Sequence, residues 1–157
     1  MFNEETWKNG EKLAQEYMKK NGYKIVDTNY ACVGVELDII AIYSRARQIK
    51  ELKAELKERL KYAEEKESKE VLKSAFEKMK AKIVPLLVFT EVKARSSERW
   101  GRGCDCVDDM KQKNIIIGAK FYQKNFKYEG YQVRFDVATV DSGVVEYIKD
   151  AFYDKNF

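Results

Sequence analysis

Apolar and polar residues in the first part of the chain alternate with a helical period. Residues 4–22 carry apolar side chains at helical spacing and end in Asn21-Gly22, which predicts an amphipathic helix. Glu11 falls on the apolar face of this helix, four residues after Trp7 and three before Ala14. Because burying an unpaired charge is costly, a carboxylate in this stripe is unexpected for a helix that only packs.

Two strands are predicted next. Segments 23–30 and 35–43 are rich in β-branched and aromatic residues and are separated by a short turn. Period two places the side chains of the second strand on opposite faces: Glu36, Asp38, Ile40 and Ile42 on one, and Leu37, Ile39, Ala41 and Tyr43 on the other. Asp38 is therefore a carboxylate among apolar neighbours.

The composition changes between Arg45 and Lys82, where Lys, Glu, Arg, Leu and Ala dominate and neither Gly nor Pro occurs. Apolar residues trace two narrow seams here, Ile49, Leu52, Leu56, Leu60 and Ala63 in the first, and Leu72, Ala75 or Phe76, Met79 and Ile83 in the second. We interpret residues 45–83 as an inserted antiparallel helical hairpin, with one long helix as the alternative. The flanking segments 1–44 and 84–157 then form a single α/β domain.

The remaining pattern predicts one buried strand, one helix and a final strand pair. Pro85 ends the charged region, and segment 86–95, "LLVFTEVKAR", begins with the apolar run of a strand covered on both faces. A loop at 96–105, a helix at 106–126 and a hairpin of strands at 131–140 and 144–150 follow. This order predicts a small α/β domain with a mixed sheet. Arg134 and Asp136 are expected to form polar structural contacts.

The composition excludes several kinds of chemistry. The 157 residues include no histidine, which excludes Ser–His and Cys–His nucleophile pairs and any hydrolase with an imidazole base. The cysteines at 32, 104 and 106 are odd in number and poorly spaced for zinc, so we interpret them as reduced thiols. The net charge of +4 permits a nucleic-acid partner without requiring one.

The sequence contains no targeting or membrane signal. The N-terminus lacks a basic segment followed by an apolar run, and no window approaches the roughly 20 apolar residues of a membrane span. We therefore expect a cytoplasmic protein that has no membrane partner.

Charged residues occupy positions where apolar ones are expected, namely Glu11, Asp38, Glu91 and Lys93. If strands 35–43 and 86–95 are neighbours, Asp38 and Glu91 can meet on one face, with Lys93 beside them. Two carboxylates about 4 Å apart repel by about 4 kcal/mol at an effective dielectric near 20, so a lysine or a divalent metal must offset them. Such a set without imidazole suits Mg²⁺-assisted phosphodiester hydrolysis.

The same residues resemble a known family. "ELDII" followed by "VFTEVKAR" resembles the metal-binding core of the PD-(D/E)XK nuclease superfamily. More closely, the chain resembles the YraN-like family of predicted endonucleases, which is related to archaeal Holliday-junction resolvases. Further matches are "GEKLAQEY" at 10–17, "NGY" at 21–23, Asn29, Gly101, Val107, Lys111-Gln112, "RFDV" at 134–137 and Ala151-Phe152. The resemblance implies a restriction-endonuclease-like αβββαβ core interrupted by the helical insertion.

The resemblance also implies roles for the misplaced charges. Asp38 and Glu91 would be metal ligands, with the backbone carbonyl of Val92 and the carboxylate of Glu11 as further candidates. Lys93 would position water or stabilise charge, so the implied catalytic set is Asp38, Glu91, Lys93 and Glu11. The implied cofactor is Mg²⁺ or Mn²⁺.

The expected partner is nucleic acid, with DNA favoured over RNA. Candidate nucleic-acid contacts are Arg95, Lys111 and Gln112, although these side chains could equally only solvate the surface. The expected activity is endonucleolytic cleavage of DNA in repair or recombination, selective for Holliday junctions or other branched DNA. The alternative is a catalytically silent nucleic-acid-binding or scaffold protein that uses the helical insertion. A homodimer formed through that insertion is compatible with either.

Overall fold

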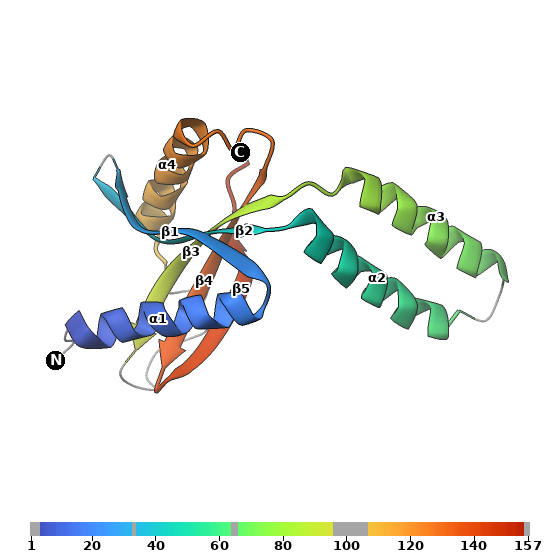
Figure 1. Cartoon of the computed structure of the whole chain (residues 1–157), viewed down its shortest axis with the longest axis horizontal. Helices are drawn as coiled ribbons and strands as arrows, with labels where there is room; N and C mark the ends of the chain where they lie inside the picture. The colour runs from blue at the N-terminus through green and yellow to red at the C-terminus, as the bar shows by residue number, and fades with distance from the viewer. Residues whose placement is uncertain (1–3, 33, 64–65, 96–106, 156–157) are drawn as a thin grey trace.

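The computed structural model describes residues 4–32, 34–63, 66–95 and 107–155, apart from the side chains of residues 4–7, 66–67 and 95 (Figure 1). Its elements are α1 (Glu4–Lys20), β1 (Tyr23–Cys32), β2 (Val35–Tyr43), α2 (Arg45–Lys61), α3 (Lys66–Lys82), β3 (Leu86–Arg95), α4 (Asp109–Asn125), β4 (Gln132–Asp141) and β5 (Val144–Phe152). The prediction of an α/β protein is confirmed.

The five strands form one mixed sheet in the order β1-β2-β3-β4-β5. Strands β3 and β4 are parallel, whereas the other neighbours are antiparallel. Pairing between β2 and β3 runs from Tyr43 opposite Leu86 to Ile39 opposite Thr90 and goes no further. The two strands therefore part immediately beside Asp38 and Glu91.

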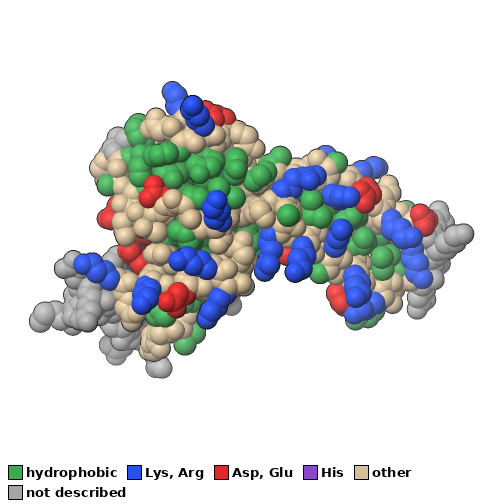
Figure 2. Space-filling view, in the orientation of Figure 1, with side chains coloured by type: hydrophobic (Ala, Val, Ile, Leu, Met, Phe, Trp, Pro, Cys, Tyr) green, Lys and Arg blue, Asp and Glu red, His purple; other side chains and the backbone are tan. Residues whose placement is uncertain are grey.

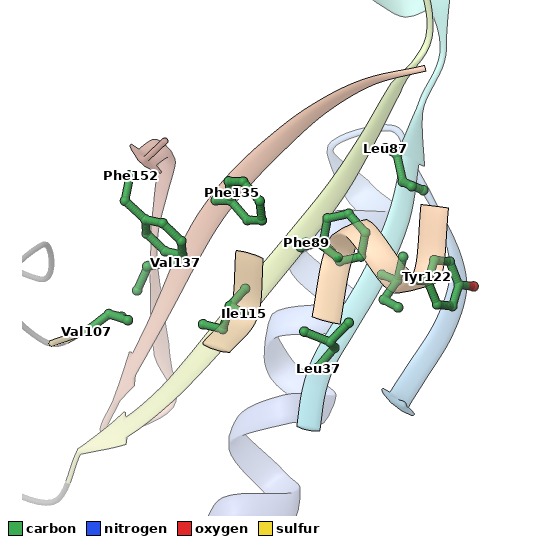
Figure 3. Close-up of a cluster of buried hydrophobic side chains, with 11 residues drawn as sticks. Leu37, Leu87, Phe89, Val107, Ile115, Tyr122, Phe135, Val137 and Phe152 are labelled. Atoms are coloured by element: carbon green, nitrogen blue, oxygen red, sulfur yellow. The ribbon is translucent and has the colours of Figure 1, made fainter. Parts of the chain in front are cut away.

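One helix covers each face of the sheet. On one face, Ala14 and Met18 of α1 pack in a buried cluster with Ile39, Ala41, Tyr43, Val88, Val92, Ala138 and Val140. On the other, Ile115, Ala119 and Tyr122 of α4 pack with Leu37, Ile40, Leu87, Phe89, Phe135, Val137 and Phe152 (Figure 3). Strand β3, at the centre of the sheet, is thus buried on both faces, as the apolar start of segment 86–95 predicted.

A glycine sets the depth at which α1 packs. A Cβ atom added to Gly10 would lie 3.1 Å from the Cβ of Ala94 on β3, closer than ordinary van der Waals contact. The absence of a side chain therefore lets the helix approach the sheet closely. Glu11, the next residue, is carried toward the sheet by this contact.

The strict period-two pattern predicted for β2 is wrong at Leu37. Its side chain packs in the α4-side cluster together with Ile40, whereas Ile39 packs on the α1 side. On β1, Asn29 lies between the partners of Leu37 and Ile39 and has a left-handed backbone with φ of 51°. This conformation, together with the end of the β2–β3 pairing, interrupts the regular alternation at Asp38.

Helices α2 and α3 run antiparallel to each other and project from the sheet as an arm (Figure 1). Two side chains of α2 bind the chain entering β3: Arg45 Nε donates to the carbonyl of Ile83 at 2.9 Å, and Gln48 Nε2 donates to that of Val84 at 2.8 Å. No side chain of α2 is buried, and Phe76 on α3 is 8% exposed. The arm therefore has a fixed base and a thin core.

Two further expectations from the sequence concern membrane spans and cysteines. None of the helices in the described ranges is long and apolar enough to cross a membrane. Cys32 is a free thiol, whereas Cys104 and Cys106 lie outside the described residues.

Candidate functional site

The structure brings Asp38 and Glu91 together where β2 and β3 part. Both carboxylates are buried, with 5% of Asp38 and 3% of Glu91 exposed. They line one narrow crevice, which has no room for a water molecule and which Ile115 of α4 also borders. Two acids from neighbouring strands thus share one low-dielectric environment, as the sequence predicted.

Asp38 is held by the backbone of β3. Its Oδ2 accepts a hydrogen bond from the Val92 N–H at 2.8 Å, in the region where the β2–β3 ladder has stopped. A strand residue directs its N–H and C=O to the same side, so the Val92 carbonyl also faces β2. The carboxylate and the carbonyl that were predicted as metal ligands therefore face the same gap.

Burial determines the protonation of Asp38. Desolvation, followed by the charge of Glu91, raises its pKa from 3.8 to about 7, against the opposing effects of the Val92 N–H and Lys111. Within the described ranges, no Lys or Arg forms an ion pair with this carboxylate. Asp38 is therefore an acid that a bound cation would ionise.

Glu91, in contrast, is paired with two lysines. Its Oε1 lies 2.8 Å from Lys93 Nζ and its Oε2 lies 3.2 Å from Lys111 Nζ. The carboxylate is buried, whereas the lysine side chains are 27% and 33% exposed. The two ammonium groups consequently connect the buried acid with the solvent edge of the site.

The start of α4 positions Lys111. Asp108 caps this helix by accepting from the Lys111 N–H at 2.8 Å, and Gln112 Nε2 donates to the Val107 carbonyl at 2.8 Å. Lys111 was predicted as a nucleic-acid contact, but sequence reasoning missed its place on Glu91. Gln112 supports the helix start through its amide. The nucleic-acid contacts of both residues stay predictions, and the Arg95 side chain lies outside the described part of the chain.

Glu11 supplies a third buried acid. It is 6% exposed, its Oε2 accepts from Asn29 Nδ2 at 3.1 Å, and its charge contributes to the raised pKa of Asp38. Helix α1 thus adds negative charge from the side of the sheet that it covers. The sequence signal was the carboxylate within the apolar stripe, whereas Asn29 was identified only as a match to the YraN-like family and not as the partner of Glu11.

The donor chemistry of the site fits a hard divalent cation. Carboxylate and carbonyl oxygens are the ligands such ions prefer, and Asp38, Glu91 and Val92 supply them. In the arrangement described, no three acidic, His or Cys side chains converge to hold an ion within the described ranges. Because Glu91 is paired with two lysines, a cation on this carboxylate would have to displace an ammonium group.

A second polar network braces the sheet beside the site. Arg134 donates to both carboxylate oxygens of the fully buried Asp136, at 2.8 and 2.7 Å, as the sequence predicted. The hydroxyl of Tyr147 donates to Asp136 at 2.7 Å and lies 3.0 Å from that of Thr90. No signal in the sequence indicated Tyr147, and Thr90 was matched only as part of "VFTEVKAR" without a role of its own. These contacts join β3, β4 and β5 next to Glu91.

Comparison with known proteins adds the family. The family model described as "Uncharacterised protein family UPF0102" matches residues 10–140, a range that contains all four predicted catalytic residues. A UPF0102 protein of Clostridium perfringens (strain ATCC 13124) is 30% identical over 149 residues, covering 91% of this chain and 89% of the relative. One from Thermodesulfovibrio yellowstonii is 29% identical over 149 residues, covering 95% and 96%. One from Caldanaerobacter subterraneus subsp. tengcongensis is 29% identical over 131 residues, covering 83% and 75%.

These matches confirm the YraN-like resemblance at the level of the family. They span the strands that carry Asp38 and Glu91 and the start of α4 that carries Lys111. The chain therefore belongs to the UPF0102 family.

Proposed function

We propose that this protein is a metal-dependent endonuclease that hydrolyses phosphodiester bonds in DNA with Mg²⁺ or Mn²⁺. The observation that carries the proposal is the pair of buried carboxylates, Asp38 and Glu91, at the gap between β2 and β3. The proposal includes a restriction-endonuclease-like core interrupted by the 45–83 insertion. It also includes action in the cytoplasm on Holliday junctions or other branched DNA, during repair or recombination.

The free-energy cost of burying two neighbouring carboxylates indicates that they have a functional role rather than a packing role. Buried carboxylates that share an environment repel each other, and apolar residues of similar size would stabilise the fold equally well or better. Asp38 bears this cost without an ion pair among the described residues. A site that binds a cation accounts for the cost, because the cation offsets the repulsion.

Each residue of the site has a role that suits hydrolysis. A bound Mg²⁺ or Mn²⁺ lowers the pKa of a coordinated water and neutralises charge on the scissile phosphate. Asp38, Glu91 and the Val92 carbonyl would hold the ion, and Glu11 would add negative charge behind them. Lys93 would orient the attacking water or bind a phosphate oxygen, since its ammonium group extends from Glu91 toward solvent.

The test is cleavage of a panel of labelled DNAs: a four-way junction, a flap, a duplex and a single strand, each in Mg²⁺ or Mn²⁺. Glu91→Gln keeps the side-chain shape and removes the charge, so it should abolish cleavage. Glu36→Gln is the matched control, because Glu36 is exposed and lies two residues before Asp38 on the same strand. Retained cutting by Glu91→Gln would remove the proposed mechanism.

The second candidate is a catalytically silent nucleic-acid-binding or scaffold protein. The pairing of Glu91 with both lysines favours it, because this carboxylate is neutralised without a metal. Deletion of residues 46–82 behind a short turn discriminates between the candidates. A nuclease core should keep some metal-dependent cutting, whereas a scaffold that works through the insertion should lose its binding.

A further inference from the structure

The charges of α2 are sorted to the two sides of its apolar seam. The residues that directly follow the seam positions Ile49, Leu52, Leu56 and Leu60 are all lysines, namely Lys50, Lys53, Lys57 and Lys61. The residues that directly precede them are Gln48, Glu51, Glu55 and Arg59. Residues three and four apart lie on one side of a helix, so α2 has a lysine flank and an acid-containing flank.

The partner helix extends the lysine flank. In an antiparallel pair, the residues that follow the seams of the two helices lie on the same face of the hairpin, and those that precede them lie on the other. A groove of about 90 Å³ between the helices is lined by Glu55, Arg59 and Ala75, each of which precedes a seam residue. The opposite face therefore carries Lys50, Lys53, Lys57 and Lys61 together with Lys73, Glu77 and Lys80 of α3, six lysines and one acid; we call it the basic face.

The basic face keeps its positive charge. Lys50, Lys53 and Lys57 are exposed and form no ion pair within the described residues. The other three, Lys61, Lys73 and Lys80, pair only with glutamates three residues earlier on their own helices. Such exposed pairs contribute little and compete weakly with a polyanion. Figure 2 shows how densely Lys and Arg side chains cover the arm compared with Asp and Glu.

The character of this face indicates which partner it fits. Protein partners are usually bound through aromatic or large apolar anchors. Of the exposed large apolar side chains of the arm, Val71 directly precedes seam residue Leu72 and so lies on the other face, Met79 belongs to the seam, and Tyr62 follows the last residue of α2. A row of lysines spaced by about 4.5 to 6 Å along α2, without an apolar anchor, matches a regular row of phosphates.

The arm also has a defined position relative to the site. Its helices join the sheet at Tyr43 and Leu86, each five residues from Asp38 or Glu91, which corresponds to about 17 Å along the strands. The lysines from Lys50 onward add about 8 to 18 Å along α2. Hydrogen bonds from Arg45 and Gln48 join α2 to the chain that enters β3 at the base of the arm. With the two lengths added end to end, the row lies up to about 25 to 35 Å from the site, or roughly 7 to 10 base pairs.

We propose that Lys50, Lys53 and Lys57 bind the phosphate backbone of duplex DNA roughly 7 to 10 base pairs from the bond that is cut. The inference rests on the proposed function, because the distance is counted from Asp38 and Glu91. The contact positions the duplex by charge and reads no base sequence. The arm then provides a second DNA-binding site, which lengthens the stretch of duplex that the protein covers.

The experiment measures DNA binding by fluorescence anisotropy in EDTA, with the full chain and flapped DNA hairpins whose stems are about 6 or about 20 base pairs long. The test variant is K50Q/K53Q/K57Q. The matched control, R59Q/K78Q/K82Q, removes the same charge from residues that precede seam positions, on the opposite face of the same arm. Wild-type protein should bind the long stem more tightly than the short one.

The test variant should lose most of this preference for the long stem, and its slope of log Kd against log salt should fall by about 3. The control should keep the preference. Equal losses in both variants, or no loss in either, would overturn the inference. Cutting of the short stem in Mg²⁺ tests the proposed function separately. The test variant should cut it at the wild-type rate, whereas a wild-type protein that cuts nothing would refute the nuclease and leave the binding result to decide on the arm.

Discussion

The burial of Asp38 makes the stability of the metal-free protein depend on pH. Its pKa is about 7 in the folded protein, against 3.8 for an ordinary solvated aspartate such as the unfolded chain presents. A group with a raised folded pKa contributes its full stability below the unfolded pKa and loses it as pH rises through the folded pKa. The free energy of unfolding should therefore fall between about pH 4 and pH 7 because of this one residue.

The magnitude follows from the shift. One pKa unit corresponds to 1.36 kcal/mol, so about three units give at most about 4 kcal/mol, of which about 2 to 3 kcal/mol are lost between pH 5 and pH 8. Asp38→Asn removes the ionisation and keeps an oxygen that can accept from the Val92 N–H. The variant should thus be more stable than wild type at pH 8, by clearly more than at pH 5.

The assay is urea denaturation of both proteins in EDTA at the two pH values. Asp136→Asn is the control, because it weakens the bidentate contact of a buried arginine, Arg134, and should destabilise by about 3 kcal/mol at either pH. Adding Mn²⁺ at pH 8 should raise the free energy of unfolding of the wild-type protein, because the ion binds the folded site. It should leave the free energy of unfolding of Asp38→Asn unchanged. Parallel pH profiles for wild type and Asp38→Asn would refute this account of the site.

Three further perturbations have defined outcomes. Gly10→Ala should lower the free energy of unfolding by about 1 kcal/mol in urea, because contact with the Ala94 Cβ at 3.1 Å outweighs the gain in helix propensity; no change would show that α1 can shift freely. Phe76→Ala should make the arm sensitive to protease while the sheet keeps its unfolding transition, because the substitution removes the main buried side chain of the arm. An equal loss of stability in the arm and in the sheet would contradict this. Lys111→Gln should tighten Mn²⁺ binding about tenfold in calorimetry, because it frees Glu91 of a competing cation; weaker binding would count against a metal on Glu91.

The sequence predicted the arrangement of the elements well because each has a clear period. The alternating and apolar runs correspond to β1 to β5, and the lysine-rich seams correspond to α2 and α3. The meeting of Asp38 and Glu91 also followed from strand order, since consecutive strands usually pair.

What the sequence did not predict depends on the backbone and on tertiary packing. The change of face at Leu37 coincides with the left-handed conformation of Asn29, which no periodicity encodes. The contact of Lys111 with Glu91 depends on where α4 begins relative to β3, and this is set by packing against the sheet. Sequence position alone could identify Lys111 as basic and exposed, but not as part of the site.

The central claim is that Asp38 and Glu91 form a metal-dependent site for phosphodiester hydrolysis. Asp38→Asn tests it most directly, because the variant is expected to be at least as stable as wild type at pH 8, so lost activity cannot be ascribed to unfolding. The measurement is single-turnover cleavage of a labelled four-way junction at pH 8. Wild type should cut in Mn²⁺ and not in EDTA, and Asp38→Asn should cut at least about a hundredfold more slowly. Cutting by Asp38→Asn at the wild-type rate, or by wild type in EDTA, would contradict the claim.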